Sequence, residues 1–567
     1  MHFRERLILS IAATLFLLTS ASSTSAQAQE IPIEILFDFG DGAYLWSYAT
    51  FSHVNETNNT WDTIRLTAGS LGISIESAWF SCCGVAILDI GNRDPPAGFV
   101  AIYLWNRTSH RWELTSEGVT SLDLREGDVL ALSNAGFDSV TFELRAPVPS
   151  PDDRSPAVMF RGDAWNRGVS ISRSPDRPRT LWDRDTGVPE IGATPAVAYG
   201  RVFVTTMRGL VALDARTGDV LWNASAARGF SSPAVFDESV FVGSSNGSVY
   251  RLNATDGSIE WATPLLAETG FSGITSSPTV AFDSVFIGTF NETGGPGEVV
   301  SLWASNGTVR WRVRTGSVHF SSPAYADGSV YVGVAGRYNT TSQITFDPPY
   351  GVIALDAATG DEEWFFETSG SISASPAVTG SYLVVPSKDG NVYAVERSDG
   401  SEVWRSAVGA GVSSASVWAG TAFVGGGSFS SAGRISALNL STGLERWSFA
   451  PNGPVQASVT YSDGKIFFAT NTAQGTVYAV SATTGELAWA ISPIPAQYIL
   501  SSPVVANGIV FAASDNGHVY AIGEEEPLPP VVGGVPPVPL VGVASVSVVA
   551  VAVVLAVLVL RRSRRAP

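Results

Sequence analysis

A phrase that recurs across residues 193–522 constrains the fold more than any other feature of the chain. Its clearest copy reads Ser231-Ser232-Pro233-Ala234-Val235, then Val240-Phe241-Val242-Gly243, then Gly247-Ser248-Val249-Tyr250, and it ends at Trp261. We count eight copies. Their spacing of roughly 40–50 residues is typical of the blades of β-propellers.

Each copy has the composition of a four-stranded sheet. Short runs of Val, Ile, Phe, Tyr and Ala favour strands, and the Asp-Gly, Asn-Gly and Thr-Gly pairs between them favour tight hairpin turns. One such sheet cannot bury both of its faces, whereas sheets stacked radially can. The sequence therefore predicts an all-β chain whose central unit, residues 157–523, is an eight-bladed β-propeller.

Tryptophan residues mark the ends of the copies. A Trp closes each of the first seven copies, but the eighth, which ends near Tyr520, has none. One more Trp, Trp182, lies upstream of the first copy. We predict that the strand around Trp182 completes the eighth sheet and closes the ring. The tryptophans expected to anchor blade packing are Trp182, Trp222, Trp261, Trp311, Trp364, Trp404, Trp447 and Trp489.

The ends of the copies also resemble a known family. Residues 212–222, Ala-Leu-Asp-Ala-Arg-Thr-Gly-Asp-Val-Leu-Trp, resemble the tryptophan-docking motif of the PQQ-like propellers, and residues 354–364 and 479–489 repeat it with small departures. Residues 159–170 resemble the lead-in that precedes the first blade in that family. The resemblance implies the fold and leaves the function open, because one fold hosts many functions.

The two ends of the chain predict export and a membrane anchor. Residues 1–28 have a charged start, an apolar run and an Ala-Gln-Ala cleavage site, which is typical of a secretory signal peptide. A Pro/Gly-rich stalk, residues 524–539, precedes the uncharged segment 540–560, which is long enough to span a bilayer as a helix. Arginines in the tail, residues 561–567, favour a cytoplasmic end. We expect a single-pass cell-membrane protein with its large domain outside.

Residues 30–146 lack the repeated phrase and predict a separate small, mostly β domain. Leu104-Trp105-Asn106, followed by Arg125-Glu126-Gly127-Asp128-Val129, resembles the β-grasp module at the C-terminal end of transcobalamin-like proteins. That resemblance implies either help in binding a corrinoid or an adhesive role. The proline-rich residues 147–156 are expected to form an extended linker to the propeller.

The chain contains two cysteines, Cys82 and Cys83. In an exported protein they either form a vicinal disulfide or remain two thiols on opposite sides of a strand. Neighbouring strand residues point apart, so the disulfide needs a distorted turn, which Ser81 and Gly84 would permit. Both alternatives stay open.

Asn-x-Ser/Thr triplets support export of a glycoprotein. Several fall in predicted hairpin turns, where a glycan would project. Chance occurrence in a Ser/Thr-rich chain is the alternative. The triplets begin at Asn55, Asn58, Asn106, Asn223, Asn246, Asn253, Asn291, Asn306, Asn339 and Asn439.

Charge and motif content argue against several classes of function. The net charge is −18, and a nucleic-acid partner needs a basic surface. The five histidines, His2, His53, His110, His319 and His518, show no metal-ligand spacing. No Gly-x-Ser-x-Gly elbow frames a Ser of the predicted innermost strands, and no phosphate-binding loop is present.

The PQQ-like resemblance also raises an enzyme hypothesis. Quinoprotein alcohol dehydrogenases of that family hold pyrroloquinoline quinone (PQQ) and Ca²⁺ at the propeller axis, with Asp, Glu, Asn and Trp residues around them and often a vicinal disulfide. Here the Cys82-Cys83 pair precedes the first blade, and no Asp, Glu and Asn set matches a family motif. The insertions at residues 291–297 and 336–350 are expected to be polar surface hairpins. We therefore expect no cofactor and no catalysis.

The favoured function is a non-catalytic, membrane-anchored scaffold or receptor that binds a protein or another ligand. Binding is expected on the top face or in the axial funnel of the propeller, where the loops that lead into the innermost strands of neighbouring blades converge. The alternatives are a membrane-anchored PQQ-dependent dehydrogenase and an adhesin that binds glycans. The candidate contact residues on the loops are Arg228, His319, Gln456 and Tyr498.

Overall fold

The computed structural model describes residues 30–524, except for 39–43, 53–59, 71–72, 81–83, 92–98, 107–110, 116–117, 126–127, 135, 137–143, 145–146, 148–157, 171, 189–191, 267–272, 282, 429–430 and 496. The predicted signal peptide, membrane-spanning segment and tail lie outside the described residues, as do Cys82, Cys83, Asn55 and Asn58. Among the described residues, no helix has the length and apolar character needed to cross a membrane.

The N-terminal unit is mostly β, with a five-stranded sheet in the order β2-β1-β7-β5-β6. Strand β1 pairs parallel with β7 and antiparallel with β2. Helix α2 packs through Ile64 and Ala68 on Ile33 and Ile35 of the sheet, because alternate residues of a strand face the same side. The elements are β1 (Glu30–Asp38), β2 (Tyr44–Ser52), α2 (Thr60–Ser70), β5 (Ala101–Asn106), β6 (Arg111–Leu114) and β7 (Val129–Ser133), with a separate hairpin of β3 (Ile75–Phe80) and β4 (Gly84–Ile90).

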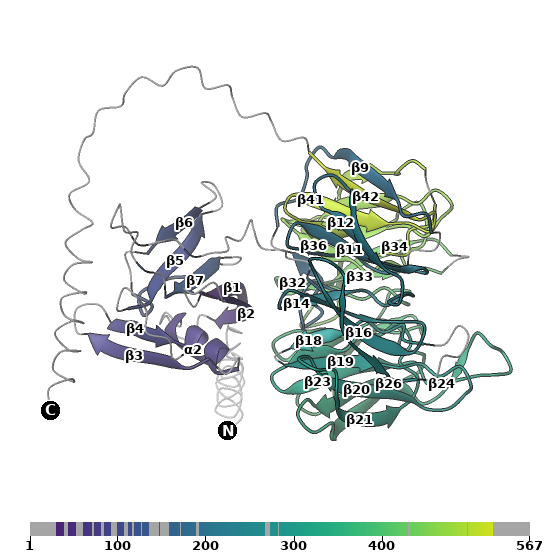
Figure 1. Cartoon of the computed structure of the whole chain (residues 1–567), viewed down its shortest axis with the longest axis horizontal. Helices are drawn as coiled ribbons and strands as arrows, with labels where there is room; N and C mark the ends of the chain where they lie inside the picture. The colour runs from purple at the N-terminus through teal and green to yellow at the C-terminus, as the bar shows by residue number, and fades with distance from the viewer. Residues whose placement is uncertain are drawn as a thin grey trace, which may run out of the picture.

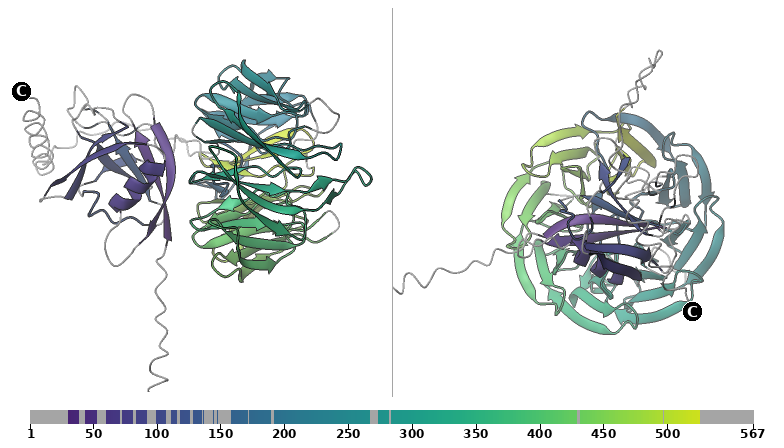
Figure 2. Two further views of the ribbon diagram at one scale, coloured as in Figure 1. Left: turned by 90° about the horizontal axis from the view of Figure 1, so that it is seen from below. Right: turned by 90° about the vertical axis from the view of Figure 1, so that its left-hand side faces the viewer.

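From Val169 onward, the described residues form eight sheets of four or five strands and one small hairpin, β24 (Arg337–Tyr338) with β25 (Phe346–Asp347). Figure 2 shows the sheets arranged around a common axis. Sheet by sheet, the strands are β10 (Ala196–Ala198), β11 (Arg201–Thr206), β12 (Gly209–Asp214) and β13 (Val220–Ala224); β14 (Ala234–Phe236), β15 (Ser239–Gly243), β16 (Ser248–Asn253) and β17 (Ile259–Pro264); β18 (Thr279–Ala281), β19 (Ser284–Gly288), β20 (Gly297–Trp303) and β21 (Val309–Thr315); β22 (Ala324–Ala326), β23 (Ser329–Val334), β26 (Tyr350–Asp356) and β27 (Glu362–Thr368); β28 (Ala377–Val378), β29 (Tyr382–Pro386), β30 (Asn391–Glu396) and β31 (Glu402–Ala407); β32 (Ser416–Trp418), β33 (Thr421–Gly426), β34 (Arg434–Asn439) and β35 (Glu445–Phe449); β8 (Val169–Ser170), β36 (Thr460–Ser462), β37 (Lys465–Ala469), β38 (Val477–Ser481) and β39 (Leu487–Ile491); and β9 (Arg179–Asp185), β40 (Val504–Ala506), β41 (Ile509–Ala513) and β42 (His518–Gly523).

The burial of each strand in a sheet follows the hydrophobicity of its residues. The second strand is apolar on both faces, as in β15, where every residue is buried. The outer strand alternates, as in β17, where exposed and half-buried residues succeed one another. This gradient is expected when two neighbouring sheets cover the inner strands and solvent reaches the outermost strand. The predicted all-β, propeller-like fold is confirmed.

The N-terminal strand β9 pairs antiparallel with β42, and Trp182 lies opposite Ala521. Both strands are labelled at the top of Figure 1. The sheet therefore takes three strands from the end of the repeat region and one from before its start. This is the pairing that the position of Trp182 predicts.

The repeated tryptophans link each sheet to the next. The indole nitrogen of Trp182 donates to the carbonyl of Ala215, 3.1 Å away, in the turn that follows β12. Five of the next six tryptophans bond a turn carbonyl in the same way at 2.9–3.2 Å, and Trp404 does so at 2.7 Å. The last, Trp489, donates to Pro175, just ahead of β9, at 2.8 Å. The series of Trp hydrogen bonds therefore starts at Trp182 in β9 and ends at Pro175, in the segment that leads into the same strand.

Candidate functional site

The Ser-Pro phrase forms a ring of hydrogen bonds around the axis. At eight positions a backbone amide donates to the hydroxyl oxygen of the equivalent residue in the next sheet, at 2.8–3.2 Å. The looser copies of the phrase also place Ser or Thr at this position. The ring runs through Thr194, Ser232, Ser277, Ser322, Ser375, Ser414, Ser458 and Ser502, and then returns to Thr194.

The lead-in segment, residues 158–170, lies inside this ring. Carbonyls along the segment accept hydrogen bonds from backbone amides of five different innermost strands, so it follows the inner wall of the sheets. The amides that donate are those of Val235, Tyr325, Val378, Val417 and Tyr461, and the carbonyls that accept are those of Val158, Ala164, Trp165, Arg167 and Gly168.

Arg161 fixes the lead-in segment to two sheets. Its buried guanidinium donates to the carbonyl of Ala415, 2.7 Å away, and to that of Val459. Burial lowers the pKa of Arg161 to about 9, which leaves the group charged at neutral pH. The lack of a side chain at Gly168 leaves space for the Arg161 guanidinium, because a Cβ at this position would overlap it.

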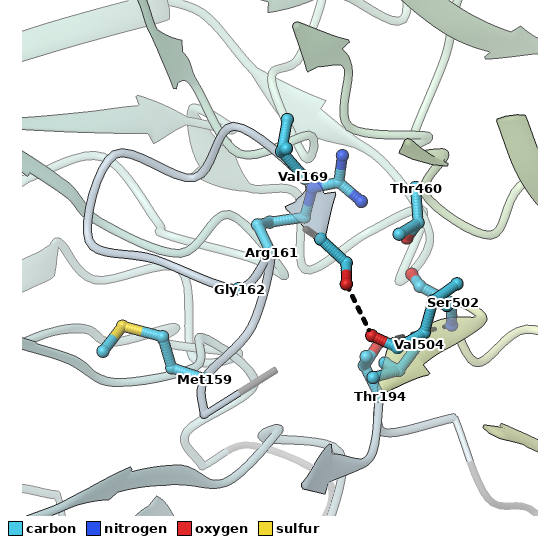
Figure 3. A pocket seen from close by; sticks show the side chains of 11 residues that line it. Met159, Arg161, Gly162, Val169, Thr194, Thr460, Ser502 and Val504 are labelled. Atoms are coloured by element: carbon cyan, nitrogen blue, oxygen red, sulfur yellow. Dashed lines mark hydrogen bonds between the residues drawn. The ribbon is translucent and has the colours of Figure 1, made fainter. Parts of the chain in front are cut away.

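A cavity of about 20 Å³ lies between the lead-in segment and the innermost strands (Figure 3). Met159, Arg161, Thr194, Thr460 and Ser502 are among its lining residues. This volume is enough for about one water molecule. Because Thr460 donates to the carbonyl of Pro503 at 2.7 Å, part of the polar lining is already satisfied by the protein.

The residues that line this cavity do not fit PQQ and Ca²⁺. Calcium requires several oxygen ligands, usually including carboxylates, and the lining of this cavity contains hydroxyls, apolar groups and the cation Arg161. Among the described residues, no group of three or more His, Cys, Asp or Glu side chains is placed to hold a metal. At about 20 Å³, this cavity is also too small for a quinone.

The four predicted contact residues lie on loops that lead into four different innermost strands. Arg228 is exposed, and its backbone amide donates to Ser244 at 3.3 Å. The side-chain oxygen of Gln456 accepts a hydrogen bond from Asn471. Tyr498 is 38% exposed, and its carbonyl accepts from Ser514 and Asp515.

His319 lies in a group of aromatic rings that the sequence analysis missed. Its ring centroid is 4.3 Å from that of Phe320, 4.8 Å from Phe290 and 5.3 Å from Phe346. Burial and, to a smaller extent, the positive charge of Lys388 lower the pKa of His319 to about 3. We call Phe290, His319, Phe320 and Phe346 the His319 cluster.

The insertion at residues 336–350 is not the purely polar hairpin that we expected. Strands β24 and β25 project from one face of the sheets (Figure 1), and Tyr338 and Phe346 are register partners. The ring of Tyr338 lies 5.2 Å from Phe290, so the hairpin packs into the His319 cluster. The aromatic residues within the insertion, Tyr338 and Phe346 among them, were the available signal. The insertion at residues 291–297 remains polar, with Thr293 bonded to Asn291.

Several predicted glycosylation sites also have a structural role. The side-chain oxygens of Asn253, Asn291, Asn306 and Asn439 each accept the backbone amide two residues later, and three of them also accept the Ser or Thr hydroxyl there. Such Asx-turns favour the same Asn-x-Ser/Thr spacing as glycosylation does. The triplet pattern therefore has a second physical cause in these turns.

Comparison with known proteins bears on both fold and family. A family model described as outer membrane protein assembly factor BamB matches residues 171–290, 263–425 and 431–526. The BamB proteins of Yersinia pestis and Shewanella oneidensis are 26% and 23% identical to the chain, each over 58% of its length and over 83% and 84% of their own.

Among solved structures, quinohemoprotein alcohol dehydrogenase from Comamonas testosteroni superposes with a TM-score of 0.55 at 16% identity, covering 69% of this chain and 82% of that one. This likeness concerns the fold alone. The family model covers more than half of the chain, including all eight copies of the phrase. The chain therefore belongs to the PQQ-like repeat family described as outer membrane protein assembly factor BamB.

Proposed function

We propose that this protein is a non-catalytic, membrane-anchored propeller that binds a protein partner through the loops leading into its innermost strands. We infer that the eight sheets are the blades of one closed propeller, which the ring from Thr194 to Ser502 and the Trp489–Pro175 bond support. The name of the BamB relatives, outer membrane protein assembly factor, supports a partner that is itself a protein.

The observation that carries the proposal is the packing of the lead-in segment along the axis. Residues 158–170 bond to five innermost strands, and the adjoining cavity holds about 20 Å³. A small-molecule reaction needs a concave site of several hundred Å³. By contrast, the loops that lead into the innermost strands, which we call the loop face, carry exposed aromatic side chains. Phe320 is 41% exposed and Tyr498 is 38% exposed. Such surface aromatic residues favour protein recognition.

The proposed membrane anchor rests on the sequence. Residues 1–28 would direct export, and residues 540–560 would span the bilayer, followed by the basic tail 561–567. The small domain and the propeller would then be displayed on the outside, on the stalk of residues 524–539. Protease protection of the tail in sealed cells, with digestion of the propeller from outside, is the expected result.

Site-specific photocrosslinking tests the binding face. A photoreactive phenylalanine analogue at Phe320 in the full-length membrane protein should give one major protein adduct. The control is the same analogue at Tyr199, which is 44% exposed, also has a positive φ, and lies at the opposite end of an innermost strand. Adducts of equal yield at both positions, or none at Phe320, would contradict the proposal.

A PQQ-dependent dehydrogenase is the second candidate, favoured only by the likeness of the fold to quinohemoprotein alcohol dehydrogenase. It predicts quinone absorbance that stays with the protein after incubation with PQQ and Ca²⁺ and removal of free cofactor. It also predicts dye-linked oxidation of alcohols. Retention of PQQ with turnover would replace the scaffold proposal with this one.

A further inference from the structure

The lead-in segment carries an unbalanced charge into the interior of the sheets. Residues 158–170 contain two arginines, Arg161 and Arg167, and one aspartate, Asp163, and all three side chains are buried. The carboxylate of Asp163 lies 2.9 Å from Nε of Arg167 and pairs with it. No other Asp or Glu is buried among the described residues from 158 onward. Arg161 therefore remains as a buried cation that forms no ion pair in the part of the chain that the structure describes.

The hydrogen bonds of Arg161 leave part of its guanidinium without a partner. A buried charge is costly unless an opposite charge and hydrogen bonds compensate it. Both hydrogen bonds of Arg161, to the carbonyls of Ala415 and Val459, come from Nη2. Its Nε is buried and has no hydrogen-bond partner among the described residues. Exposed arginines are hydrated by bulk water, but Arg161 is only 4% exposed. Its free N–H groups therefore need an acceptor inside the protein.

The cavity of about 20 Å³ lies beside this cation. Figure 3 shows the side chain of Arg161 in the wall of this space, together with those of Thr194, Thr460 and Ser502. A cavity of this volume admits one group of about the size of a water molecule. A carboxylate or a phosphate group is too large for it, so the acceptor that fits is water or a monatomic anion.

Two hydroxyl groups in the lining have hydrogens to donate. The oxygens of Thr194 and Ser502 accept the amides of Ser502 and Ser458, at 3.2 and 2.9 Å, and neither hydroxyl donates to an acceptor among the described residues. Thr460, by contrast, already donates to the carbonyl of Pro503. The lining residues include no Asp or Glu. A buried cation and two unused hydroxyl donors favour an anion, because water carries no charge to balance Arg161 and needs acceptors for its own hydrogens.

We propose that this cavity binds a single halide ion, chloride under physiological conditions, through the Arg161 guanidinium and the hydroxyl groups of Thr194 and Ser502. The ion balances the charge of the lead-in segment. Thr194 belongs to the first copy of the repeated phrase and Ser502 to the last, so the ion also connects the lead-in segment to both. The site is separate from the loop face, and this inference does not rest on the proposed function.

Chloride linkage tests the site in the full-length protein in detergent micelles. Chloride is exchanged for gluconate, which is larger than the cavity, at constant ionic strength, and urea unfolding is followed by tryptophan fluorescence. A ligand that binds only the folded state stabilises it by mass action. Above the dissociation constant, each tenfold rise in free chloride should therefore raise the free energy of unfolding by about 1.4 kcal/mol. Bromide, a halide of similar size, should act in the same way.

A matched pair of variants isolates the anion site from the ring of hydrogen bonds. Ser502→Ala removes a hydroxyl that lines the cavity and should weaken chloride binding by about tenfold or more, because a hydrogen bond to a charged group is lost. Ser458→Ala removes the equivalent hydroxyl of the neighbouring sheet, which accepts the amide of Ser414 at 3.0 Å and does not line the cavity. Each variant loses one bond of the ring, but Ser458→Ala should keep the chloride dependence of the parent protein. In Arg161→Gln this dependence should disappear.

Crystals of the full-length protein grown in bromide locate the ion, and the expected result is an anomalous diffraction peak in the cavity beside Arg161. A cavity that holds only water would overturn the inference. Stability that does not depend on chloride would also overturn it, and a bromide peak would then mean binding at crystal concentration only. Equal weakening of chloride binding in Ser502→Ala and Ser458→Ala would contradict the assigned contacts. The crosslinking at Phe320 decides the proposed function independently of these results.

Discussion

The backbone amide of Ser502 donates to Oγ1 of Thr194, 3.2 Å away, and this bond joins the last Ser-Pro phrase of the chain to the first. The two residues are 308 positions apart. Thr194 is buried, so its hydroxyl is shielded from bulk water. The bond is one link in a ring of eight equivalent links, and each link depends on a single hydroxyl.

We predict that Thr194→Val lowers the free energy of unfolding by about 1–3 kcal/mol, because the buried amide of Ser502 loses its acceptor while side-chain volume is kept. Thr194→Ser keeps the hydroxyl and should cost less, about 1 kcal/mol for the lost methyl group. Urea denaturation followed by tryptophan fluorescence measures both. Equal losses in the two variants would show that the hydroxyl contributes nothing.

Arg161→Met should release the lead-in segment from the sheets. The carbonyls of Ala415 and Val459 lose their donor, and we expect a loss of about 2–4 kcal/mol. Hydrogen exchange within residues 158–170 should become faster than in the parent protein. Arg208→Met, at an exposed loop arginine, is the control and should change stability by no more than about 0.5 kcal/mol. Unchanged exchange in the segment would argue against Arg161 as its anchor.

Gly218→Ala should disturb the contact between two sheets. Its φ is 74°, and an added Cβ would lie 2.7 Å from the ring of Trp182. Gly200→Ala is the matched control, with a φ of 68° and open space around the new Cβ. Both variants cost about 1–2 kcal/mol for the left-handed backbone, and Gly218→Ala should cost clearly more. Thermal unfolding of the two variants, compared side by side, isolates the contact with Trp182.

The stability contributed by His319 should depend on pH in a defined direction. Its folded-state pKa is about 3, below the ordinary 6.5, so the unfolded chain binds more protons between these values. The contribution is fully present above about pH 6.5 and is lost as the pH falls toward 3. The stability advantage of the parent protein over His319→Gln should therefore shrink on acidification, by at most about 1.4 kcal/mol per pH unit. A difference that is constant from pH 7 to pH 4 would contradict the burial of the neutral ring.

The repeated elements of the fold were predictable because their signals are local and periodic. Trp182 could be assigned to the last sheet because the seven other tryptophans fix the position at which it is missing. The His319 cluster could not be predicted, because Phe290, Phe320 and Phe346 lie on separate segments of the chain and meet only in the folded protein.

The pairing of β9 with β42 places a limit on when the propeller can be completed during synthesis. Strand β9 leaves the ribosome first, and its partner, residues 518–523, follows some 340 residues later. At about 5–20 residues per second, that interval is roughly 17–70 s. Throughout this time the pairing edge of β9 lacks its partner strand, and an unpaired strand edge is a place where other chains can pair.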